Sequence, residues 1–284
     1  MTSRTYSRNI EIKPHMEFPA GMRRIALGVE YAGAEFNGFQ RQVSTSNTVQ
    51  GKLEFGLSRI ANEPITLVCA GRTDAGVHAT GQIVHFDTYA ERPDRAWIEG
   101  VNTKMPAEVR VHWVKEVGPS FHARFSATSR VYRYVIHATR VRSALLRHQV
   151  SWVTAPLELA LMAEAGASLV GRHDFSAYRA AQCQSKSPVR EIESLRFFTQ
   201  GPLIVMEIKA NAFLHHMVRN IAGVMIEIGK GVKPVSWAAE LLAGRDRSKA
   251  AMTASPFGLY LVDVTYPQCF DLPQMPLGPV FLNC

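Results

Sequence analysis

The chain has 284 residues, of which 46% are hydrophobic and 20% charged, a balance that is ordinary for a globular protein. Its formal net charge of +8 at pH 7 favours a polyanionic partner, nucleic acid before membrane, although an indifferent basic surface would give the same value. No stretch approaches the ~18 apolar residues that a spanning helix needs. Composition therefore argues against a membrane protein.

The N-terminal segment 1–22 is expected to be a disordered tail, because it has little hydrophobic pattern and lacks the apolar core of a secretory signal. The four cysteines lie far apart without a Cys-x-x-Cys pair, so neither a zinc site nor a disulfide framework is predicted. Both observations fit a cytoplasmic protein.

Strand and helix patterns follow one another along a first part of the chain, 23–128. Period-two alternation and apolar runs predict strands at 25–31, 65–69, 82–86 and 109–113. Apolar residues at helical spacing predict helices at 48–61 and from Pro93 to Met105. This mixture, without long structureless loops, argues for layered α/β or α+β packing.

A second part, 129–284, continues the mixture. Strands are expected at 129–136, 191–198, 203–210 and 258–264. Helices are expected at 157–170, from Met217 onward, and at 236–242, where Ser236 is placed to cap the helix. The polar stretches 173–179 and 185–189 are expected to be loops.

One short loop between two strand patterns has an unusual set of residues, Gly71-Arg72-Thr73-Asp74-Ala75-Gly76-Val77-His78. The two glycines allow a tight turn and close approach of a ligand. Asp74 is thus offered at a strand end, where rigid scaffolds present reactive groups. A lone Asp between glycines is more often a turn cap, so the pattern by itself leaves both roles open.

Tyr132 and Tyr134 alternate with Arg133 along a strand, so the tyrosines share one face and Arg133 lies on the other. Aromatic planes with interleaved arginines suit an RNA-facing strand. The alternative is that both tyrosines belong to the core. A basic cluster follows, either solvated or in contact with a nucleic-acid backbone: Arg140, Arg142 and Arg147.

The string Phe213-Leu214-His215-His216-Met217-Val218-Arg219 opens the helix expected after strand 203–210. His215 and Arg219 are spaced to share one face of that helix. Two adjacent histidines need a third ligand to hold a metal, and none is spaced nearby, so no metal site is predicted. Taken alone, Arg219 would be a solvated helix arginine.

These three strings together resemble the motifs of the TruA-type tRNA pseudouridine synthases, and the resemblance covers about residues 23–284. It implies that Asp74 is the catalytic carboxylate, that Tyr132 contacts the target uracil, and that Arg219 pairs with Asp74. Further RNA contacts are expected from Arg72, His78, Arg133 and His215. The family's N-terminal signature is altered here at Ala32, Phe36 and Phe39.

The resemblance also implies the α+β pseudouridine synthase fold, a central mixed, mainly antiparallel sheet with flanking helices, and a homodimer that binds tRNA. The expected reaction isomerises uridine to pseudouridine at positions 38–40 of the anticodon arm. No group leaves and no redox change occurs, so no cofactor and no metal are expected. Two alternatives remain: an RNA-binding or tRNA-folding module without essential catalysis, and a glycosidase, which normally uses two carboxylates where only one strong candidate appears.

Overall fold

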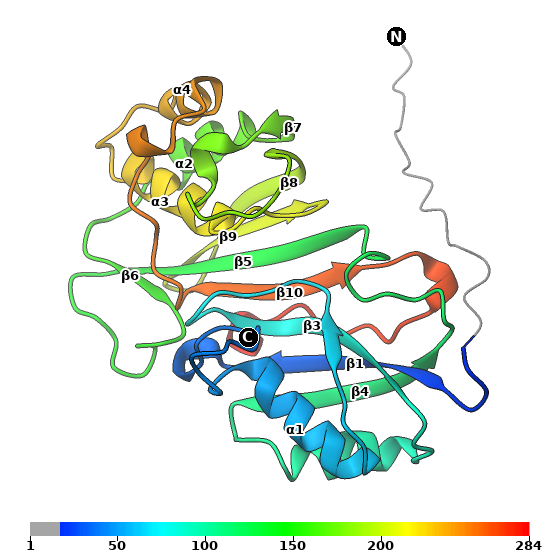
Figure 1. Ribbon diagram of the computed structural model, residues 1–284. Helices are drawn as coiled ribbons and strands as arrows, with labels where there is room; N and C mark the ends of the chain where they lie inside the picture. The colour runs from blue at the N-terminus through cyan, green and yellow to red at the C-terminus, as the bar shows by residue number, and fades with distance from the viewer. Residues whose placement is uncertain (1–17, 284) are drawn as a thin grey trace.

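The computed structural model describes residues 18–283, which are built around one large sheet (Figure 1). Its strands are β1 (Arg23–Tyr31), β2 (Leu67–Cys69), β3 (His78–Thr88), β4 (Val109–Val117), β5 (Ser129–Ala138), β6 (Ser151–Val153), β7 (Gly171–Asp174), β8 (Val189–Gln200), β9 (Leu203–Ala210) and β10 (Leu259–Thr265). The α-helices are α1 (Val49–Ala61), α2 (Leu159–Ala167), α3 (Met217–Gly229) and α4 (Trp237–Gly244). A π-helical turn spans Ala96–Gly100.

The strand order is β4-β1-β3-β10-β5-β9-β8-β7, with β2 added on β3 and β6 on β5. Only the β3–β10 and β5–β6 pairs among the described strands are parallel. The expected mixed, mainly antiparallel sheet with flanking helices is therefore confirmed. Figure 1 shows α1 over the β1–β4 side and α2, α3 and α4 gathered beyond β9.

Strand β5 shows how the alternation of its sequence divides the interior. Tyr132 and Tyr134 share one face, as the alternation predicts, and that face points into the main core, which also contains the buried face of α3. Val131 and Val135 point to the opposite face, where a smaller core includes Leu282 from the C-terminal segment. One strand thus separates a face that helices cover from a face that the chain end covers.

Strand β10 is last in sequence but central in the sheet. It pairs in parallel with β3 through Tyr260 and Leu261, and antiparallel with β5 from Leu259 to Thr265. The sheet therefore continues across the predicted boundary at residue 128, and the division into two parts stays a prediction. Most of the predicted N-terminal tail lies outside the described residues.

Several predicted elements differ from the structure at short or weakly patterned segments. Residues 171–174, expected to be mostly loop, form the edge strand β7, and 151–153 form the unpredicted β6, because backbone pairing alone defines these short strands. The helix expected from Pro93 includes the π-helical turn. Ser236 precedes α4 but its side chain makes no capping hydrogen bond, because its backbone is already helical (φ −60°, ψ −23°).

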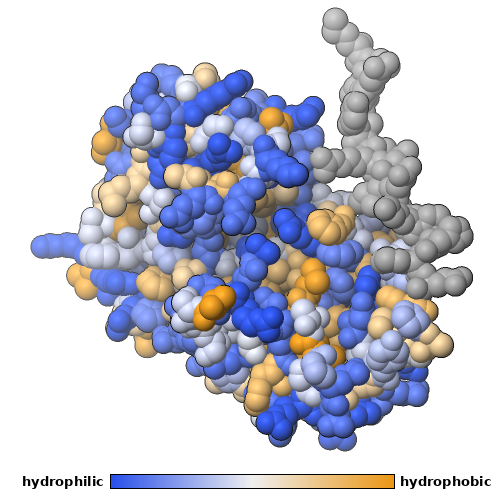
Figure 2. All heavy atoms as spheres, viewed as in Figure 1, coloured by the Kyte–Doolittle hydropathy of each residue, from blue (hydrophilic) through white to orange (hydrophobic). Residues whose placement is uncertain are grey.

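The described helices are all too short or too polar to cross a membrane. Figure 2 shows mostly hydrophilic side chains over one face, with apolar side chains scattered between them. This surface agrees with the composition of the chain.

Candidate active site

The loop between β2 and β3 is held tightly by its neighbours. Gly38 has φ +89°, and a Cβ at that position would lie 3.0 Å from the Thr73 carbonyl oxygen. The backbone N–H of Phe39 donates to the same oxygen (3.0 Å), and the N–H of Val77 donates to the Asp74 carbonyl (3.1 Å). Glycine at position 38 has no Cβ and tolerates the positive φ, so the segment 37–40 can lie directly against the loop and support it.

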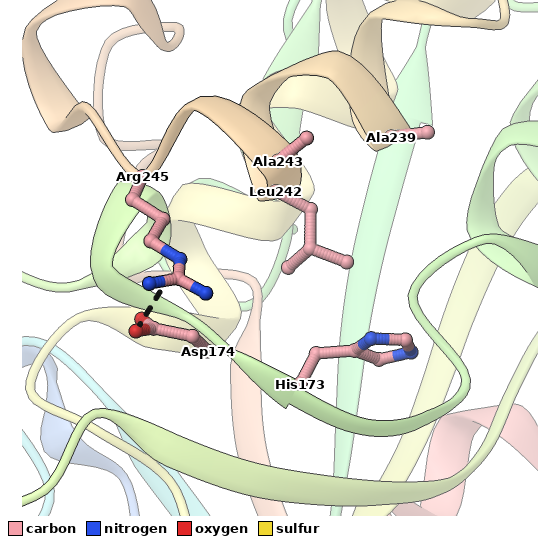
Figure 3. A pocket seen from close by; sticks show the side chains of 6 residues that line it. All are labelled: His173, Asp174, Ala239, Leu242, Ala243 and Arg245. Carbon is pink, nitrogen blue, oxygen red and sulfur yellow. Dashed lines mark ion pairs between the residues drawn. The ribbon is translucent and has the colours of Figure 1, made fainter.

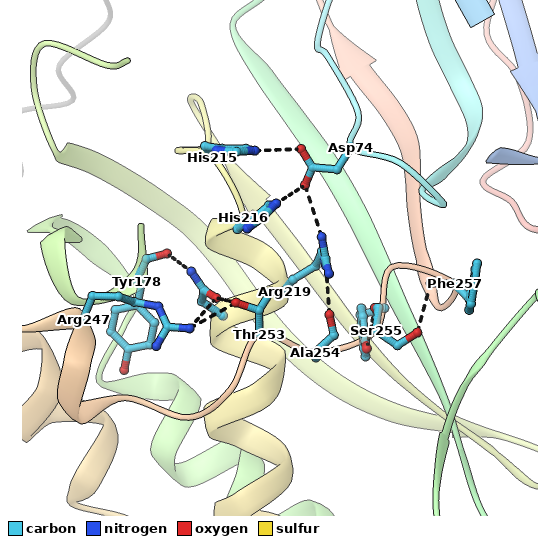
Figure 4. Close-up of polar contacts among 12 residues, drawn as sticks. Asp74, Tyr178, His215, His216, Arg219, Arg247, Thr253, Ala254, Ser255 and Phe257 are labelled. Carbon is cyan, nitrogen blue, oxygen red and sulfur yellow. Dashed lines mark hydrogen bonds and ion pairs between the residues drawn. The ribbon is translucent and has the colours of Figure 1, made fainter. Parts of the chain in front are cut away.

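Asp74 faces three nitrogen-bearing side chains, two from the connection between β9 and α3 and one from the first turn of α3 (Figure 4). Its Oδ1 lies 3.3 Å from Nε2 of His215, and its Oδ2 lies 3.4 Å from Nε2 of His216 and 3.6 Å from Nη1 of Arg219. His216 has a left-handed backbone (φ 61°) directly before α3. His215 therefore precedes the helix, and the expected shared helix face is wrong, although both side chains reach Asp74.

Arg219 is fixed independently of Asp74. Its Nε donates to the Ala254 carbonyl (2.8 Å), while the backbone N–H of Ala254 donates to the Arg219 carbonyl (3.2 Å). Only 13% of the Arg219 side chain is exposed. The guanidinium is thus held at its place before any ligand arrives.

Tyr132 reaches the same space from β5. Its ring meets Phe213 edge-to-face, with centroids 5.0 Å apart. Burial, and then the neighbouring Asp74 carboxylate, raise the pKa of the Tyr132 hydroxyl, so the group stays protonated at neutral pH. Within residues 18–283 no side chain or carbonyl hydrogen-bonds this hydroxyl, so it is available to a ligand.

These groups open into a cleft of about 1260 Å³. The cleft exceeds the usual range of small-molecule pockets, roughly 300–1,000 Å³. Among the described lining residues Asp74 is the only carboxylate, and five are arginines: Arg72, Arg124, Arg130, Arg190 and Arg219. Such a lining suits a large polyanion that brings its own negative charge to a single reactive carboxylate.

Comparison with known proteins shows the family to which the chain belongs. A family model described as tRNA pseudouridine synthase matches residues 28–126 and 165–267. The tRNA pseudouridine synthase A of Shewanella denitrificans is 56% identical over 259 residues, covering 91% of this chain and 99% of the relative. That of Pseudomonas aeruginosa is 52% identical over 264 residues, covering 93% of each. The chain belongs to the tRNA pseudouridine synthase family.

A solved chain from a Cbf5-Nop10-Gar1 complex matches with a TM-score of 0.34 at 10% identity, over 84% of this chain and 48% of that one. This likeness is too weak to carry an argument. The family assignment depends on the family model and on the sequence relatives.

Five of the residues expected from the family resemblance line the cleft: Arg72, Asp74, Tyr132, His215 and Arg219. Two others have different surroundings. Arg133 is buried on the opposite face of β5, where its Nε donates to Glu207 (2.8 Å) and its Nη1 to the Gly278 carbonyl (2.8 Å). The expected RNA contact from Arg133 is therefore replaced by an anchor for the C-terminal segment.

His78 is also a structural residue, only 3% exposed. Its Nδ1 accepts a hydrogen bond from the Gly33 N–H (3.1 Å), and its ring stacks on Tyr260 with centroids 4.7 Å apart. Burial lowers the pKa of His78 to about 4, which keeps it neutral. The motif histidine thus ties β3 to β10 and does not face the cleft.

Sequence reasoning missed His216 and three cleft arginines: Arg124, Arg130 and Arg190. Arg130 carried a usable signal, since it lies two residues before Tyr132 on the same face of a strand. It donates to the carbonyls of Ala70 (3.0 Å) and Arg124 (2.8 Å), so it braces the cleft floor. His216 had no such signal, because its approach to Asp74 depends on a left-handed backbone.

The sequence shows no third metal ligand near His215 and His216. In the structure Asp74 supplies a third group, although it is distant in sequence. Ligand atoms of Asp74, His215 and His216 lie within 4.8 Å of one another, close enough to hold a metal ion. Arg219 nevertheless approaches the same carboxylate and would repel a dication there. The prediction of no metal at this cluster stays a prediction.

A second, smaller cavity of about 280 Å³ lies between β7 and α4 (Figure 3). Asp174 and Arg245 form an ion pair across it (3.6 Å), and His173 lies beside it. None of the residues that face Asp74 lines this cavity. It therefore forms no part of the site assigned to the family motifs.

Proposed function

We propose that this protein converts uridine to pseudouridine at positions 38–40 in the anticodon arm of tRNA, with Asp74 as the catalytic carboxylate. The observation that carries the proposal is the meeting of Asp74 with Arg219 and both histidines beside Tyr132. Membership of the tRNA pseudouridine synthase family supports the substrate class, and the motif resemblance supports the positions.

The reaction breaks the N1–C1′ glycosidic bond and forms a C5–C1′ bond, while a hydrogen leaves C5 and N1 gains one. Such an isomerisation requires a reactive anion, a counter-charge, a flat surface for the base and a hold on the RNA. Asp74 supplies the anion, and the Arg219 guanidinium, 3.6 Å from it, supplies the counter-charge. Tyr132 is the stacking surface, since its raised pKa disfavours proton release.

A stacked or paired uridine must first leave its stem, at a cost of a few kcal/mol. The exposed Arg72, two residues before Asp74, is placed to contact the phosphate of the extruded nucleotide. The other cleft arginines add attraction for the backbone. Binding free energy from the arm as a whole would thus offset the cost of extrusion.

The deciding experiment measures pseudouridine in unmodified tRNA after incubation with wild type or Asp74→Asn, without added metal or cofactor. Asn keeps the shape and removes the charge, so we expect conversion by the wild type only, with equal tRNA binding. Asp271→Asn is the matched control, because Asp271 is exposed and pairs with Lys115 outside the cleft.

Two outcomes would contradict the proposal. Conversion by both proteins would show that Asp74 is not the catalytic carboxylate. Equal tRNA binding without any conversion would identify an RNA-binding module. A glycosidase is disfavoured already, because hydrolysis normally uses a pair of carboxylates and Asp74 is alone among the described cleft residues.

The same proposal includes a homodimer and a cytoplasmic location, where tRNA is available. Two exposed apolar side chains support a subunit contact: Leu145 is 90% and Val280 78% exposed. Their neighbours Leu146 and Phe281 pack in the same small core, which brings the two segments together.

A further inference from the structure

A chain of hydrogen bonds lies beneath the loop that carries Asp74. Gln82 of β3 bonds both backbone polar groups of Gly71: its Nε2 donates to the Gly71 carbonyl (2.7 Å), and the Gly71 N–H donates to its Oε1 (3.4 Å). The same Nε2 donates to the Tyr31 hydroxyl on β1 (3.2 Å). That hydroxyl in turn bonds the Thr73 hydroxyl (2.8 Å).

These polar groups are deeply buried, with Gln82 at 0%, Tyr31 at 2% and Thr73 at 7% exposure. A buried polar group without a partner costs about 1–3 kcal/mol, so each member depends on the next. β1 and β3 are adjacent and paired, with Val29 opposite Gln82 and Tyr31 opposite Ala79. The chain of hydrogen bonds is therefore attached to two paired strands of the sheet.

The two residues that the chain holds, Gly71 and Thr73, lie on either side of Arg72 and directly before Asp74. Thr73 is held from a second direction, because the Phe39 N–H donates to its carbonyl (3.0 Å). Arg72 is thus fixed at its backbone while its side chain is exposed in the cleft. The backbone of Asp74 follows directly on Thr73, which is held in the same way.

We propose that Tyr31 and Gln82 are positioning residues for catalysis: they touch no substrate, and they hold the loop so that Arg72 and Asp74 meet RNA in a productive arrangement. This inference rests on the proposed function. A displacement of about 1 Å at a reacting group costs up to roughly a hundredfold in rate. The contribution is therefore expected in the chemical step and not in tRNA affinity.

The test compares Tyr31→Phe with Tyr178→Phe under single-turnover conditions on unmodified tRNA. Each change removes one buried hydroxyl; that of Tyr178 donates to the Ala238 carbonyl (2.9 Å), away from the loop. We expect Tyr31→Phe to lower the conversion rate about ten- to a hundredfold. Its tRNA Kd should stay within about twofold of wild type, and Tyr178→Phe should keep the wild-type rate while losing similar thermal stability.

Thr73 provides a second pair of variants in case Tyr31→Phe folds poorly. Thr73→Ser keeps the hydroxyl, so its conversion rate should stay close to that of the wild type. The conversion rate of Thr73→Val should fall as far as that of Tyr31→Phe. The double variant Tyr31→Phe/Thr73→Val should be no slower than Tyr31→Phe alone, because Tyr31→Phe already removes the bond between the two hydroxyls.

An active wild type with a full-rate Tyr31→Phe, or with Thr73→Val as fast as Thr73→Ser, would overturn the positioning role alone. Equal losses of rate in Tyr31→Phe and Tyr178→Phe would also overturn it, by showing a general effect of stability. A wild type that converts no uridine would overturn the proposed function together with this inference.

Discussion

At the scale of single residues, the partners of Asp74 are close but not tightly bonded. The three distances of 3.3–3.6 Å exceed the roughly 2.7–2.9 Å of a strong charge-assisted hydrogen bond. Burial lowers the pKa of His216 despite the opposing effect of Asp74, so Arg219 is the permanent cation of the cluster. The carboxylate is thus loosely held, and its contacts are free to tighten around a substrate.

The exposed guanidinium of Arg72 in the cleft is expected to contact an RNA phosphate. If its guanidinium contacts a phosphate, Arg72→Ala should weaken tRNA binding and reduce the slope of log Kd against log salt by about one. Arg95→Ala is the control, because Arg95 is exposed and paired with Glu99 outside the cleft. Filter binding across a salt series measures both slopes, and equal slopes for Arg72→Ala and wild type would exclude the phosphate contact.

At the scale of elements, β3 carries two buried histidines as well as the support for the loop. Burial lowers the pKa of His78 to about 4 and that of His85 to about 3. Each folded-state pKa lies below the ordinary value of 6.5. Between that pKa and pH 6.5 the unfolded chain therefore binds more protons than the folded chain. Stability should therefore fall as the pH drops below about 6.5.

The effect of His78 alone amounts to about 2 kcal/mol between pH 7 and pH 5. His78→Asn should be less stable at pH 7 but should lose about 2 kcal/mol less on acidification. Urea unfolding of both proteins at the two pH values measures the difference. An unchanged pH dependence would show that His78 does not titrate in this window.

The same scale shows what the sequence could and could not predict. Strict alternation assigned the faces of β5 correctly, placing Tyr132 opposite Arg133. It could not show which face opens to the cleft, because Arg133 is covered by a segment around Gly278, far along the chain. Short edge strands such as β7 carry no alternation, and the approach of His216 to Asp74 depends on one backbone angle.

At the scale of the whole molecule, the proposed catalytic groups come from distant parts of the chain. Asp74 lies between β2 and β3, Tyr132 on β5 and Arg219 on α3, and one sheet fixes all three supports. The family motifs identified these residues because each belongs to a distinctive string. The meeting itself follows from sheet order, which local patterns do not encode.

The homodimer gives a prediction at this scale. Light scattering should report twice the chain mass of 31.5 kDa at micromolar concentration. Leu145→Asp with Val280→Asp should give the monomer mass, because a charge in an apolar contact is costly when buried. Phe55→Asp, at an exposed apolar site on α1, is the control. A wild type of 31.5 kDa at every concentration would exclude the dimer.

The central position of β10 has a consequence for synthesis on the ribosome. The strand that joins β3 to β5 is made after all the other described strands, and the Ala254 carbonyl that holds Arg219 lies shortly before it in the chain. A nascent chain can form the β1–β3–β4 and β5–β9 pairs earlier, but its two groups of strands stay unjoined until residues 259–265 emerge. Competence to modify RNA is thus acquired in one step, once residues 259–265 have left the ribosome.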